Sequence, residues 1–110
     1  MIVKNLTRKT IISKDLKEAK TLEDQVLGLL KKSNPRSLLF KISTGIHTFG
    51  LKQEIDVMVL DSSQKVVKQA VIKPNSVFFW NPKYGLILEL PQGTIQKSKT
   101  KLSDLIGFGI

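Results

Sequence analysis

The stretch IDVMVL at residues 55–60, followed by DSSQ at residues 61–64 and KVVKQAVI at residues 65–72, decides the fold class of this chain. Its first segment is short, rich in β-branched residues and apolar on both faces apart from Asp56, which is typical of a core strand. The polar residues that follow favour a hairpin turn, after which the third segment returns antiparallel. These residues therefore predict a β-hairpin inside a mainly β protein.

Similar short apolar segments flank this hairpin on both sides. We expect strands at residues 38–42, 46–51, 77–80, 85–90 and 105–110, and one or two more within residues 1–20. Turns rich in Asn, Pro, Gly and Ser separate most of these segments. Residues 94–99 are expected to form a short helix.

One longer helix is predicted in the first half of the chain. Thr21 is a suitable N-cap, and an apolar face follows from Leu22 to Leu30 before Asn34 and Pro35 end the segment. A helix of this length most often covers a sheet. Around seven short strands and one such helix predict a single-domain antiparallel β-sandwich or a partly open barrel over residues 1–110. Alternating βαβ units are missing, which argues against a doubly wound parallel sheet.

Composition narrows the classes of function. The 110 residues are 41% hydrophobic and 25% charged, as in a globular protein. The chain has no cysteine, which excludes disulfides, thiolate nucleophiles and cysteine-ligated zinc. Because the sequence shows no apolar leader and no long apolar stretch, a cytoplasmic location is the default expectation.

The net charge of +9 attracts polyanions such as nucleic acid, anionic lipid or acidic glycan. Lysine dominates over arginine, whereas specific phosphate or base recognition usually recruits arginine. The lysines are spread along the chain, so solvated surface residues are the favoured interpretation. Non-specific nucleic-acid binding stays open as an alternative, and it requires the lysines to gather on one face.

Several segments resemble the domain-of-unknown-function family 192. They are residues 21–30, GIHTFGLK at residues 45–52 followed by IDV at residues 55–57, the hairpin at residues 59–67, and LELPQGT at residues 88–94. Lys52 stands where one branch of that family has arginine, and Asn75-Ser76 stand where it has Trp-Arg. The resemblance implies a β-sandwich of jelly-roll type and brings no established activity or cofactor.

Residue types that carry catalysis or bind metals are sparse. His47 is the one histidine, and no serine stands in a nucleophile motif. Glu54 and Asp56 are two residues apart and therefore share one face of a strand, but a second histidine for a metal triad is missing. We therefore predict no catalytic residue, no metal and no cofactor. Asp56 is expected to find hydrogen-bond donors, because an unpaired buried carboxylate is costly.

The leading hypothesis from the sequence is a non-enzymatic binding domain of otherwise unknown function. Its predicted contact surface comprises His47, Thr48, Phe49, Lys52, Asp56 and Trp80. The partner would be a protein or an anionic ligand. The alternative from another class is a small enzyme acting on an anionic substrate, in which His47 and Asp56 form an acid–base pair and Lys52 holds the anion.

Overall fold

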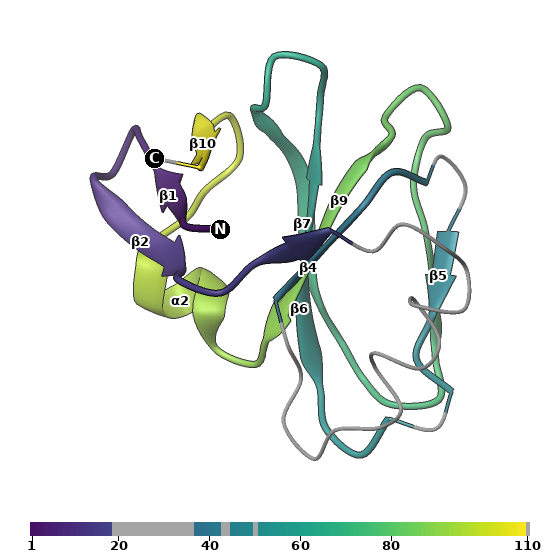
Figure 1. Cartoon of the computed structure of the whole chain (residues 1–110). Coiled ribbons are helices and arrows are strands. Elements are labelled where there is room, and N and C mark those ends of the chain that lie inside the picture. Colours follow the sequence, from purple (N-terminus) through teal and green to yellow (C-terminus); the bar gives the residue numbers. More distant parts are fainter. Residues whose placement is uncertain (19–36, 43–44, 50, 110) are drawn as a thin grey trace.

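The computed structural model describes residues 1–18, 37–42, 45–49 and 51–109. The elements in this part of the chain are β1 (Val3–Asn5), β2 (Thr10–Ser13), β3 (Lys17–Glu18), β4 (Leu38–Phe40), β5 (Gly45–His47), β6 (Ile55–Leu60), β7 (Val66–Ile72), β8 (Val77–Phe79), β9 (Leu86–Pro91), α2 (Thr94–Ser98) and β10 (Ile106–Phe108). They form a three-stranded sheet β10-β1-β2, a five-stranded sheet β3-β4-β9-β6-β7 and a two-stranded ribbon β5-β8 (Figure 1).

The five-stranded sheet lies between the other two (Figure 1). Strand β6 occupies the bounds that the sequence predicts, and it pairs antiparallel with β7 on one side and β9 on the other. The predicted turn is confirmed, because Oδ1 of Asp61 accepts the amides of Ser63 and Lys65, both at 2.9 Å. The mainly β class is confirmed, and the sheets are not closed into a barrel. Among the described strands, β3 and β4 run parallel and the other pairs are antiparallel.

Strand alternation fills both faces of the five-stranded sheet. One face carries cluster 1, whose buried residues are Leu38, Phe40, Leu51, Ile55, Val57, Val59, Ile72, Phe78, Trp80 and Ile87. The other face carries cluster 2, whose buried residues are Val3, Ile12, Leu16, Leu39, Met58, Leu60, Val66, Leu88, Leu90 and Ile106. The ribbon β5-β8 therefore covers cluster 1, and the sheet β10-β1-β2 covers cluster 2. Two consecutive residues of β6 can both be buried because each face has its own core.

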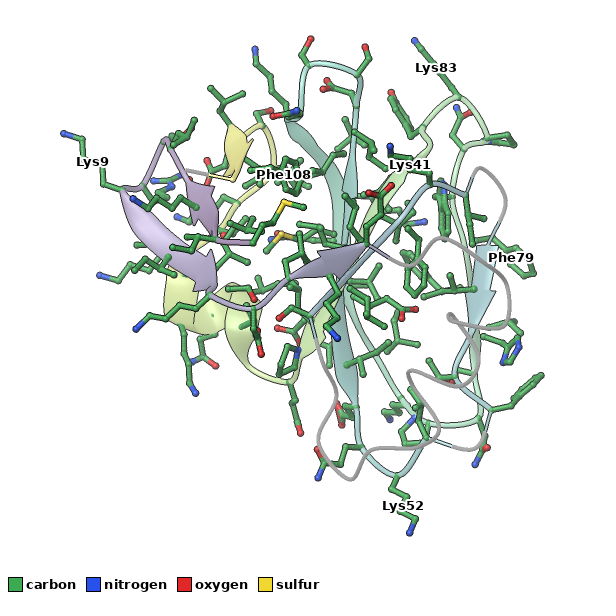
Figure 2. The ribbon with its side chains drawn as sticks, viewed as in Figure 1. Lys9, Lys41, Lys52, Phe79, Lys83 and Phe108 are labelled. Atoms are coloured by element: carbon green, nitrogen blue, oxygen red, sulfur yellow. The ribbon has the colours of Figure 1, made fainter. Side chains whose placement is uncertain are left out.

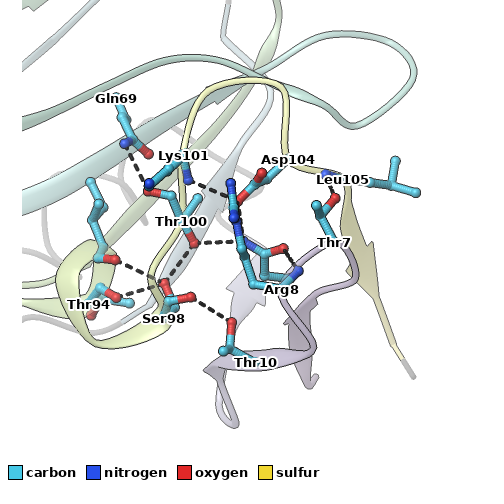
Figure 3. A network of polar contacts seen from close by, with 12 residues as sticks. Thr7, Arg8, Thr10, Gln69, Thr94, Ser98, Thr100, Lys101, Asp104 and Leu105 are labelled. Atoms are coloured by element: carbon cyan, nitrogen blue, oxygen red, sulfur yellow. Dashed lines mark hydrogen bonds and ion pairs between the residues drawn. The ribbon is translucent and has the colours of Figure 1, made fainter.

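A polar network holds the two ends of the chain together (Figure 3). Oδ2 of Asp104 accepts hydrogen bonds from Nδ2 of Asn5 at 2.9 Å, from Nε of Arg8 at 3.0 Å and from the Lys101 amide at 2.9 Å. Burial alone would raise the pKa of Asp104, but the hydrogen bonds from Arg8, Asn5 and the Lys101 amide and the Arg8 charge lower it below its ordinary value. We call residues 1–16 and 94–109, which contain β1, β2, β10 and α2, the terminal lobe.

The helices predicted from sequence have different outcomes. The short one is confirmed as α2, which spans Thr94–Ser98. The helix expected after Thr21 lies outside the described residues. Within the part of the chain that the structure describes, no helix is long and apolar enough to cross a membrane.

Candidate functional site

The ribbon β5-β8 has an inner and an outer side. Its register places Gly45 opposite Phe79, Ile46 opposite Phe78, and His47 opposite Val77. Ile46 and Phe78 pack on cluster 1. The alternate positions therefore point outward, and Val77 and Phe79 are exposed to 55% and 66%.

Phe49 extends this outer side beyond the end of β5. Its ring stacks on His47 with centroids 4.9 Å apart, and its amide donates to Nδ1 of His47 at 3.4 Å. The ring remains 53% exposed. We call the exposed surface of His47, Phe49, Val77 and Phe79 the ribbon face. Figure 2 shows Phe79 at the edge of the molecule, pointing away from it.

Thr48 fixes the base of the ribbon and is itself buried. Its Oγ1 donates to the Lys73 carbonyl at 2.6 Å and accepts the Ser76 amide at 2.9 Å. Its own amide donates to the Ser76 carbonyl at 2.9 Å, and its carbonyl accepts the Asn75 amide at 3.0 Å. Thr48 thus ties the end of β5 to the segment between β7 and β8, and its hydroxyl already both donates and accepts a hydrogen bond.

A lysine lies beside the ribbon face. Nζ of Lys68 donates to the Phe79 carbonyl at 3.0 Å. Lys73 is exposed, and Thr48 bonds to its carbonyl. Lys52 is exposed and projects into solvent at the bottom edge of the molecule, away from Phe79 at the right edge (Figure 2). Of these three lysines, Lys68 is held against the ribbon by its bond to Phe79, and it places a positive charge beside the apolar surface.

Asp56 lies on the other side of the central sheet. It shares its face of β6 with Met58 and Leu60, which belong to cluster 2. It is 1% exposed, and its Oδ2 accepts the amide of Ile95 in the first turn of α2 at 2.7 Å. The hydrogen-bond donor that Asp56 was expected to find is therefore a backbone amide of α2, and Asp56 is not brought together with His47.

Trp80 lies beneath the ribbon rather than on its outer side. It is buried in cluster 1, where its ring meets Phe78 at a centroid distance of 5.8 Å. Its indole Nε1 donates to the Tyr84 carbonyl at 2.8 Å. Of the six residues named from sequence, the structure therefore gathers His47, Thr48 and Phe49, while Lys52 is exposed at the bottom edge of the molecule (Figure 2). Trp80 lies inside the core, next to Phe78.

Glu89 is a buried acid for which no role was predicted from the sequence. It lies in β9 between Leu38 of β4 and Val57 of β6, is 1% exposed, and both carboxyl oxygens lack a hydrogen-bond partner among the described residues. Burial raises its pKa to about 8. The signal in the sequence was a single acid inside the strand LILELP, whose other positions are apolar.

Metal chemistry finds no support in the described ranges. Within them, no group of three or more His, Cys, Asp or Glu side chains lies close enough to hold an ion.

Comparison with known proteins gives a fold and a family. The structure is similar to that of a candidate transcription regulator from Sinorhizobium meliloti 1021, with a TM-score of 0.77 and 14% identity over 96% of this chain and 89% of that one. It is also similar to a protein of unknown function from Novosphingobium aromaticivorans, with a TM-score of 0.75 and 14% identity over 97% of this chain and 82% of that one. At this identity the two structures support the fold alone.

The sequence comparison is more specific. No family model matches the chain, so the resemblance to family 192 stays a prediction. UPF0127 protein PH1112 of Pyrococcus horikoshii is 31% identical over 88 residues, which cover 74% of this chain and 76% of that protein. The chain belongs to the UPF0127 family.

Proposed function

We propose that this protein is a non-enzymatic binding domain that recognises a protein partner through the ribbon face. The observation that carries the proposal is the adjacency of three large apolar side chains, Phe49, Val77 and Phe79, each more than half exposed. Scattered exposed apolar residues are ordinary, but a contiguous group rimmed by polar residues marks an interaction surface.

The chemistry of this surface defines the partner. Aromatic side chains with few rotatable bonds are the usual anchors of protein interfaces. Lys68 lies beside them, bonded to the Phe79 carbonyl, and a lysine at a rim favours acidic residues on the other side. The partner would therefore present an apolar segment flanked by Asp or Glu. Val77 adds an aliphatic contact that protein side chains match well.

The alternative of an enzyme with His47 and Asp56 as an acid–base pair is not supported by the positions of these two residues. A general acid–base pair must lie within hydrogen-bond reach of one substrate. His47 is exposed on the ribbon, whereas Asp56 is buried against cluster 2 and bonded to α2.

A displayed library of random peptides, selected against the immobilised domain, tests the proposal without knowledge of the natural partner. Selected peptides would then be titrated against the wild type, the double variant Phe49→Ser/Phe79→Ser, and the control Val71→Ser. Val71 is 56% exposed on β7, away from the ribbon face, so the control removes a similar apolar side chain elsewhere.

We expect the selected peptides to combine apolar and acidic residues. Their affinity should fall at least about 10-fold in the double variant, which is a modest loss for two interface anchors. Val71→Ser should bind as the wild type does. Peptides that bind all three proteins equally would overturn the proposal.

A further inference from the structure

We infer that the terminal lobe binds the surface of anionic lipid bilayers through the outer side of the sheet β10-β1-β2. This inference does not depend on the ribbon face, which lies on the opposite layer of the molecule (Figure 1). It rests on an aliphatic surface, on the charge gathered around it, and on the chemical type of the cations.

The aliphatic surface follows from the alternation of β1. Val3 and Asn5 are fully buried toward cluster 2, so Ile2, Lys4 and Leu6 point outward. Lys4 pairs with Ile11 of β2 and with Gly107 of β10. We call the outward side chains the lobe face: Ile2, Lys4, Leu6, Ile11 and Leu105. Its four aliphatic members are among the exposed large hydrophobic residues.

The same register explains why these side chains lie side by side. The Leu6 amide donates to the Leu105 carbonyl at 2.8 Å, and the Gly109 amide donates to the Ile2 carbonyl at 2.8 Å. Gly107 stands at the centre opposite Lys4 and adds no side chain of its own. The result is a shallow aliphatic surface with a lysine in its middle.

Two basic stretches that are far apart in the sequence meet in this lobe. Thr10 of β2 donates to the Ser98 carbonyl of α2 at 2.7 Å, which places α2 beside β2. The lobe contains seven basic residues and two acidic ones, so its net charge is 7 − 2 = +5. Its lysines are Lys4, Lys9, Lys14, Lys97, Lys99 and Lys101, and none of them forms an ion pair within the described residues.

The kinds of side chain favour lipid over nucleic acid. Nucleic-acid surfaces combine positive charge with exposed aromatic rings for base stacking, and with arginine forks for base edges. In the described lobe the one aromatic side chain, Phe108, packs against cluster 2, and the guanidinium of Arg8 is engaged by Asp104 at 3.0 Å. Aliphatic groups among lysines instead suit the boundary between headgroups and acyl chains of an anionic bilayer.

Vesicle flotation tests this inference. The full chain would be mixed with vesicles of three parts phosphatidylcholine to one part phosphatidylglycerol, and in parallel with vesicles of phosphatidylcholine alone. The test variants are Lys9→Gln/Lys97→Gln, which removes charge, and Ile11→Thr, which keeps a β-branched residue but removes aliphatic surface. The matched control is Lys52→Gln/Lys83→Gln, which removes the same charge far from the lobe (Figure 2).

We expect the wild type to bind the anionic vesicles and not the neutral ones. Loss of two lobe lysines should weaken partitioning about 30-fold, while the control pair changes it much less. Ile11→Thr should reduce the part of the binding that survives added salt. Absence of wild-type binding, or equal losses from the lobe and control pairs, would overturn the inference. The inference would also be overturned if the protein bound a single-stranded oligonucleotide through Lys9 and Lys97 and did not bind the vesicles.

Discussion

The ring of Phe79 lies over Gly45 so closely that a Cβ on Gly45 would stand 2.6 Å from Cδ1 of that ring. The same Cβ would stand 2.9 Å from the Phe78 carbonyl oxygen. The aromatic ring of Phe79 on β8 therefore covers the backbone of Gly45 on β5. Such cross-strand pairs of an aromatic residue with glycine stabilise glycine in exposed strands. Phe79 is the more exposed of the two phenylalanines of the ribbon face, and this contact holds its ring over the strand.

Replacement of Gly45 by alanine should displace the Phe79 ring. We expect Gly45→Ala to lower the free energy of unfolding by about 1–3 kcal/mol, as overpacking does elsewhere. The measurement is urea unfolding of Gly45→Ala, Phe79→Ala and the double variant. In the double variant part of the loss should be recovered, since the ring is one of the two contacts that the new methyl group meets. Strict additivity of the two single effects would contradict this account.

The fold followed from sequence where patterns are local. Strand β6 and its turn were predicted because their signals are local. β-Branched residues favour a strand where they stand, and Asp61 bonds to backbone amides only two and four residues later. The parallel pairing of Lys17 with Leu38 was not predicted, because two residues of β3 carry too little pattern to specify a partner strand.

The hydroxyl of Thr48 should matter for stability rather than for recognition. Thr48→Val removes the donor to Lys73 and the acceptor for Ser76, so we expect a loss of about 1–3 kcal/mol in the free energy of unfolding. Thr48→Ser keeps the hydroxyl and should lose less. Urea midpoints of both variants provide the comparison. If Thr48→Val proves as stable as Thr48→Ser, the hydrogen bonds of the Thr48 hydroxyl contribute nothing to stability.

Glu89 should make the protein less stable as pH rises. Its pKa is about 8 in the folded state and 4.5 as a free side chain, so the folded protein retains a proton that the unfolded chain releases between these values. The unfolded state binds fewer protons in this window, and the free energy of unfolding therefore falls, by roughly 3–5 kcal/mol in all.

Glu89→Leu should abolish that decline and raise stability at neutral pH, because leucine needs no hydrogen-bond partner in the core. Glu89→Gln should also abolish the fall in stability with rising pH, but it should not raise stability at neutral pH. Chemical unfolding at a series of pH values from about 5 to about 9 measures both effects. A wild type whose stability is flat across this range would show that Glu89 is solvated or paired in the folded protein.

Asp104 should have the opposite pH dependence. Its pKa is lowered in the folded state from an ordinary value of 3.8, so its contribution is present above that value and is lost as pH falls through the folded pKa. We expect Asp104→Asn to cost about 2–4 kcal/mol at neutral pH, since Arg8, Asn5 and the Lys101 amide all lose an ionised acceptor. Thermal unfolding at neutral and acidic pH gives the comparison, and the gap between variant and wild type should narrow in acid.

The candidate site was only partly accessible from sequence. His47, Thr48 and Phe49 are consecutive, so one motif was enough to bring them together. Asp56 shares that sequence region, yet it is buried in cluster 2 because strand alternation assigns it to the face of Met58. Val77 and Phe79 joined the surface only through the pairing of β5 with β8, a contact between segments about 30 residues apart that no local pattern specifies.

Backbone amide chemical-shift mapping of the isotope-labelled domain with a selected peptide tests the central claim most directly. We expect localised, saturable shifts at residues 45–49 and 77–79 that persist at moderate salt, because apolar contacts dominate the ribbon face. Shifts confined to other elements, or diffuse shifts over scattered lysines that disappear with salt, would show that the ribbon face is not the binding surface.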